Sequence, residues 1–84
     1  MKVSVTIDLS VPAVKKHWRQ MELAAAVLTD SRSSVQVSQP AGNRKRLIAR
    51  FTVPKARQAD IVDRIGRQFW NVEDYCDSTI GFGP

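Results

Sequence analysis

Apolar and polar residues alternate along three stretches of the chain and recur at helical spacing along two others. The alternation predicts half-buried strands over residues 2–9, 34–39 and 46–53. In the first and third stretches the apolar residues are Val3, Val5, Ile7 and Leu9, and Leu47, Ala49, Phe51 and Val53. Residues 40–43, Pro-Ala-Gly-Asn, have the composition of a turn, so the second and third strands are expected to form a hairpin.

Two segments carry apolar residues every three or four positions, as amphipathic helices do. Ser10 and Pro12 precede the first segment, which predicts a helix over 12–29. Its expected core face consists of Val14, Trp18, Met21, Ala25 and Leu28. Pro54 opens the second segment, which predicts a helix over 54–70. Its expected core face consists of Ile61, Val62, Ile65 and Phe69.

Two residues of the second helix have special expected roles. Gly66 lies inside the helix, where glycine is unfavourable by about 1 kcal/mol relative to alanine. We therefore expect close packing there, against the alanine run 24–26 of the first helix. Asn71 is expected to end the helix in a left-handed conformation.

A fourth strand over 74–82 completes the order of elements. Its phase stays open, because either the set Ser78, Ile80 and Phe82, or Tyr75 with its i+2 neighbours, can face the core. The order βαββαβ predicts one α+β domain over 1–84, a ferredoxin-like sandwich. Its antiparallel sheet is expected in the order 4-1-3-2, with both helices on one face. In this topology Asp8 is expected opposite Arg46, and Ser4 opposite Arg50.

Strand parity gathers candidate binding residues on the sheet face that the helices leave uncovered. If odd-numbered residues of 46–53 face the helices, Arg46, Ile48 and Arg50 face the other way. Arg44 and Gln36, from the turn and the neighbouring strand, are expected beside them. This face can be a solvated surface, the contact surface of a homodimer with Ile48 as its apolar anchor, or a site for nucleic acid or another anion.

The charge distribution favours an anionic partner. The 84 residues carry a formal net charge of +5. Between Asp30 and Asp60 the sequence contains seven Lys or Arg residues and no acid, a local surplus that is typical of surfaces binding RNA, DNA or phosphorylated ligands. RNA-recognition motifs stack bases on aromatic residues of the two central strands. The corresponding outward positions here are Ser4, Thr6, Ile48 and Arg50. None of them is aromatic, so the base-stacking chemistry of that family does not carry over.

The remaining composition predicts a cytoplasmic protein without catalytic chemistry. No apolar run approaches the roughly 20 residues of a membrane span. Cys76 is the only cysteine, which excludes an intrachain disulfide and favours a reducing compartment. His17 is also single, and the acids Glu73, Asp74 and Asp77 do not have the spacing of a calcium loop. We therefore expect no catalytic residue, no metal site and no cofactor.

In length and element order the chain resembles ACT-type regulatory domains, which bind small effectors through a glycine-bearing loop after the first strand. The corresponding residues 8–12 here, Asp-Leu-Ser-Val-Pro, contain no glycine, so no site residue carries over. From the fold, the small size and the lack of catalytic chemistry we expect a small non-enzymatic binding, regulatory (ACT-like) or adaptor module that acts as a homodimer. The alternative is binding of RNA or single-stranded nucleic acid through the basic hairpin and the open sheet face.

Overall fold

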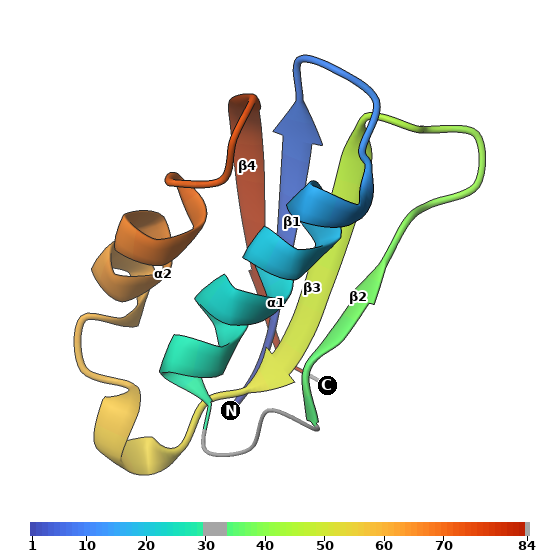
Figure 1. Cartoon of the computed structure of the whole chain (residues 1–84). Coiled ribbons are helices and arrows are strands. Elements are labelled where there is room, and N and C mark those ends of the chain that lie inside the picture. Colours follow the sequence, from blue (N-terminus) through green and yellow to red (C-terminus); the bar gives the residue numbers. More distant parts are fainter. Residues whose placement is uncertain (30–33, 84) are drawn as a thin grey trace.

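The sheet has the predicted topology (Figure 1). In this computed structural model, which describes residues 1–29 and 34–83, four antiparallel strands form one sheet in the order β2-β3-β1-β4. The strands are β1 (Lys2–Leu9), β2 (Gln36–Ser38), β3 (Arg46–Thr52) and β4 (Tyr75–Phe82). The helices are α1 (Lys15–Leu28), the short 3-10 helix η2 (Lys55–Arg57) and α2 (Ile61–Phe69). Both α-helices cover the same face of the sheet, which confirms the α+β sandwich with strand order 4-1-3-2.

The register of β1 against its two neighbours decides which side chains share a face. Asp8 lies opposite Arg46 and Ser4 opposite Arg50, as predicted. The ladder between β1 and β4 shifts after Asp8, so Leu9 pairs with Tyr75 although Ile7 pairs with Ser78. Such a bulge inserts one residue and reverses the parity of the strand beyond it. The set Ser78, Ile80 and Phe82 therefore lies on the helix-facing side, and of the other set only Tyr75, beyond the bulge, joins it.

The helices begin and end at positions that differ from those predicted. α1 begins at Lys15 instead of residue 12, because Val14 is extended and the amide of Ala13 donates to the carbonyl oxygen of Arg44 at 2.8 Å. The predicted helix 54–70 is divided into η2 and α2. Between them Asp60 adopts φ 55°, a left-handed conformation that interrupts a right-handed helix.

The end predicted for the second helix was wrong, and the nearest neighbour of Gly66 is not one that was predicted. Asn71 is not left-handed; α2 ends with Trp70 in a helical conformation, and the left-handed residue of this connection is Asp74, with φ 61°. A Cβ on Gly66 would lie 3.4 Å from the indole ring of Trp70. Trp70, which follows one turn later, therefore supplies the atoms nearest to the position that Gly66 leaves free.

The core face of α1 is rotated relative to the prediction. Its buried residues are His17, Met21, Ala24, Ala25 and Leu28. Trp18 is half-buried, and Val14 lies outside the helix with 54% of its surface exposed. On α2 the side chain of Val62 is 55% exposed, although the other predicted core residues of that helix are buried.

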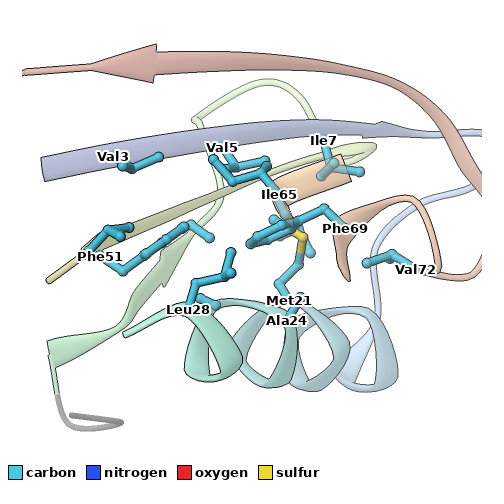
Figure 2. Close-up of a cluster of buried hydrophobic side chains, with 14 of the residues drawn as sticks. Val3, Val5, Ile7, Met21, Ala24, Leu28, Phe51, Ile65, Phe69 and Val72 are labelled. Atoms are coloured by element: carbon cyan, nitrogen blue, oxygen red, sulfur yellow. The ribbon is translucent and has the colours of Figure 1, made fainter. Parts of the chain in front are cut away.

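One apolar core joins both helices to the sheet (Figure 2). Side chains from β1, including Val5 and Ile7, point toward Met21 of α1 and Phe69 of α2. The rings of Phe51 and Phe69 stack with their centroids 5.9 Å apart. Full burial of such a side chain stabilises a fold by about 1.5–3 kcal/mol, so the core fixes which face of the sheet remains uncovered.

Candidate functional site

The sheet face opposite the helices, called the open face below, is mostly polar. It carries the outward residues of four strands: Lys2, Ser4, Thr6 and Asp8; Gln36 and Ser38; Arg46, Ile48, Arg50 and Thr52; and Asp77 and Thr79. Strand pairing orders these residues in rows across the sheet. One row contains Arg46, Asp8 and Asp77, and another contains Gln36, Arg50, Ser4 and Gly81. Residues four positions apart on a strand are about 13 Å apart, so the two arginine rows are separate places.

Arg46 is neutralised by the strand next to it. Its Nε donates to Oδ1 of Asp8 at 2.7 Å, and one of its terminal nitrogens donates to Oδ2 at 3.3 Å. The hydrogen bond and the charge of Asp8 raise the pKa of Arg46 above its ordinary value. Asp77 continues the same row on β4. This row therefore holds two carboxylates for one guanidinium group and is not a site for an added anion.

Arg50 has different surroundings. It is exposed and forms no ion pair with the described residues, and its guanidinium group donates a hydrogen bond to the hydroxyl of Ser38 at 3.2 Å. A hollow of about 440 Å³ opens beside it, at the end of the sheet where β1 begins and β3 ends. The lining of this hollow includes Lys2, Ser4, Gln36, Arg50, Thr52 and Gly83. The hollow thus combines the guanidinium group of Arg50 with hydroxyl, amide and ammonium groups.

The other residues predicted for the site lie away from the hollow. Arg44 is exposed in the turn before β3, where its carbonyl oxygen accepts hydrogen bonds from the amide of Ala13 and from Gln39. This connection lies at the end of the sheet far from both chain termini (Figure 1). Ile48 lies midway, between Ser38 and Thr6. Of the five residues predicted, the structure brings only Arg50 and Gln36 together at the hollow.

A buried polar pair was missed by the sequence reasoning. His17 is 1% exposed; its Nδ1 accepts the amide hydrogen of Val14 at 3.0 Å, and its Nε2 lies 2.9 Å from Oδ2 of Asp74. Because Nδ1 accepts, Nε2 carries the proton and donates to Asp74. The pair ties the start of α1 to the connection between α2 and β4. The two residues are 57 positions apart, and no sequence pattern links them.

No metal-binding group was found within the described residues, where no three His, Cys, Asp or Glu side chains converge. Cys76 is exposed and is the residue at which β4 bulges. None of the described helices has the length and apolarity needed to cross a bilayer. Comparisons with protein-family models, with curated proteins and with solved structures found no match to this chain.

Proposed function

We propose that this domain is a non-enzymatic binding module of the cytoplasm, regulatory or adaptor in role, which takes a small anion in the hollow beside Arg50 and acts as a homodimer. One observation carries the proposal: Arg50 is exposed beside a hollow and has no carboxylate partner among the described residues, whereas Arg46 on the same face has Asp8. Guanidinium groups bind carboxylates and phosphates through two parallel hydrogen bonds. The volume of about 440 Å³ lies within the range of small-molecule sites.

The lining supports binding over catalysis. Its described polar side chains are hydroxyl, amide, ammonium and guanidinium groups, and they include no carboxylate, imidazole or thiol. A serine or threonine hydroxyl becomes an effective nucleophile when an adjacent general base, such as an imidazole or a carboxylate, takes its proton, and the described lining contains neither group. His17 does not supply a base, because it lies on the buried face of α1 with both ring nitrogens engaged in hydrogen bonds.

A titration with inorganic phosphate and a dicarboxylate, followed by amide NMR shifts, tests the anion site. Arg50→Gln is expected to weaken binding about ten- to hundredfold, the value of a charge-assisted hydrogen bond. Arg44→Gln is the matched control: it removes the same charge from an exposed position outside the hollow. We expect it to change affinity less than twofold. Equal weakening by both variants, or no binding at millimolar anion, would refute the site.

Single-stranded nucleic acid is the second candidate. The exposed basic side chains in the turn between β2 and β3 favour it. Arg44 and Lys45 are exposed in the turn, about 20 Å along β3 from Arg50. A polyanion long enough to contact both places would be weakened by Arg44→Gln as well as by Arg50→Gln. Its affinity would also fall steeply with salt, since each neutralised phosphate releases counterions. Polarisation titrations with a mixed single-stranded RNA at two salt concentrations separate this candidate from a small anion.

The proposed homodimer follows from the size of the domain and from its surface. A chain of this length buries only roughly 60–65% of the area that its unfolded form exposes. Trp70 and Phe82 keep 63% and 50% of their surfaces exposed. Association with a second copy would bury part of that apolar surface.

A further inference from the structure

The outer edge of β4 is open in the described chain. β4 has eight residues and lies at the end of the sheet, whereas β2, at the other end, has three. The amide of Gly83 donates to the carbonyl oxygen of Lys2 at 3.0 Å, toward β1. Because successive amides of a strand point to opposite sides, those of Ser78, Ile80 and Phe82 point outward. An edge of this kind is a template for a further strand.

Two exposed aromatic side chains flank this edge on the helix side of the sheet. Phe82 is paired with the buried Val3 and therefore lies on the face that the helices cover. Trp70 donates from its ring nitrogen to the hydroxyl of Ser78 at 3.4 Å, so it lies beside the edge on the same side. The apolar surface thus continues past the last strand of the sheet.

We propose that two copies of the chain join through β4, antiparallel, with the two-fold axis at Ile80. This inference rests on the proposed homodimer and names its interface. The axis must pass through a residue, because only then do paired residues lie on the same face of one continuous sheet. Ile80 then faces its own copy, and each outward amide of the edge meets a carbonyl oxygen of the partner.

On the helix side this register buries the exposed aromatics. An axis at Ile80 pairs residues whose numbers sum to 160, so Ser78 lies opposite the partner's Phe82. Trp70 already contacts Ser78, which places the partner's Phe82 against Trp70. Aromatic side chains in the buried centre of an interface supply most of its binding energy, and symmetry gives this contact twice.

On the open face the same register brings opposite charges together. Asp77 lies opposite the partner's Gly83, and Gly83 lies next to Lys2 on β1. Two strand spacings, about 10 Å, then separate Asp77 from the partner's Lys2, and the glycine between them leaves room for both side chains. An axis at Ser78 or Thr79 would place Asp77 farther from Lys2. Charge complementarity therefore selects Ile80.

The local hydrogen bonds are compatible with this exchange. At present Asp77 accepts the outward amide of Ser78 through Oδ1 at 2.8 Å. When Asp77 turns toward the partner's Lys2, the amide of Ser78 becomes available to the partner's Phe82 carbonyl oxygen. Each lost contact is thus replaced by one across the interface.

Cysteine cross-linking tests the register directly, in the full chain with Cys76→Ser as the background. Two residues that face each other in a hydrogen-bonded pair have Cα atoms about 5.5 Å apart, within disulfide range. Ile80→Cys is therefore expected to give a covalent dimer on mild oxidation. Thr79→Cys is the matched control, because its two copies would lie about 8 Å apart, too far for a disulfide. Cross-linking at 79 and not at 80 would overturn the register.

A charge exchange tests the ion pair by sedimentation. Lys2→Asp and Asp77→Lys are each expected to weaken the dimer about five- to twenty-fivefold, and the double variant to restore it toward wild type. A dimer that neither cross-links at 80 nor responds to these changes overturns the interface and leaves the proposed homodimer standing. A wild-type chain that stays monomeric at several hundred micromolar overturns both. The anion site is judged separately, by the Arg50 and Arg44 variants.

Discussion

Replacing His17 by leucine tests whether the buried pair with Asp74 holds the fold together. The leucine side chain cannot form the two hydrogen bonds of the imidazole ring. Because leucine has a similar size, the change leaves little cavity. The amide of Val14 loses its acceptor at 3.0 Å, and Asp74 loses its donor at 2.9 Å. An ordinary hydrogen bond contributes about 1 kcal/mol, and a polar group left without its partner in a partly buried position costs up to about 3 kcal/mol. Because the side chain of Asp74 is 34% exposed, water can replace its lost donor. We expect a total loss of about 2–3 kcal/mol in unfolding free energy.

Urea denaturation at neutral pH and one protein concentration measures this loss. A change of 2–3 kcal/mol lowers the melting temperature of a domain of this size by roughly 10–20 °C. Asp74→Asn is the matched control, because its amide oxygen still accepts from Nε2 of His17 and asparagine tolerates the left-handed φ of 61°. We expect it to cost less than about 1 kcal/mol. If Asp74→Asn destabilised as much as His17→Leu, the pair would depend on charge and the neutral tautomer would be wrong.

Two further predictions concern α2 and the connection that follows it. Hydrogen bonding from Gln20, followed by the charge of Lys16, lowers the pKa of Glu73; this stabilisation is present above the unfolded pKa and is lost as pH falls through the folded value. Glu73→Gln should therefore be less stable than wild type at pH 7 and converge with it in acid, as urea titrations at several pH values would show; a difference that persists at pH 2 would contradict this. Gly66→Ala should stabilise by up to about 1 kcal/mol in thermal denaturation, because alanine favours the helix and its Cβ would only touch Trp70, at 3.4 Å; a lower melting temperature would show that Trp70 cannot yield.

The sheet was predictable because the pattern of apolar and polar residues within each strand is enough to identify the strand and its buried face. Strict alternation over 2–9 identifies the central strand, and the parity of 46–53 identifies the face of each residue. Antiparallel order then places Asp8 opposite Arg46, as observed. Each of these steps needs only neighbouring residues and the chain order of the elements.

The helix boundaries were not predictable, because contacts between distant segments set them. Val14 has the right spacing for the apolar face of α1. However, the hydrogen bond from the amide of Ala13 to the carbonyl oxygen of Arg44 keeps the chain extended there. The first buried residue of α1 is therefore His17, and its hydrogen-bond partner Asp74 lies 57 residues away in the sequence. A polar residue at a core position is stable only when such partners exist, and the partners come from the folded chain.

The candidate site shows the same limit in a different form. Arg46 and Arg50 have the same chemistry, the same strand and the same face, so composition and parity treat them alike. What separates them is the residue that β1 places opposite each: a carboxylate at Asp8 and a hydroxyl at Ser4. Pairing therefore decides that one arginine is neutralised and the other remains available. The hollow beside Arg50 adds a second condition, since its lining comes from β2, from the start of β1 and from the residue after β4. A basic run in a sequence acquires a binding role only where the strand next to it leaves the charge unpaired.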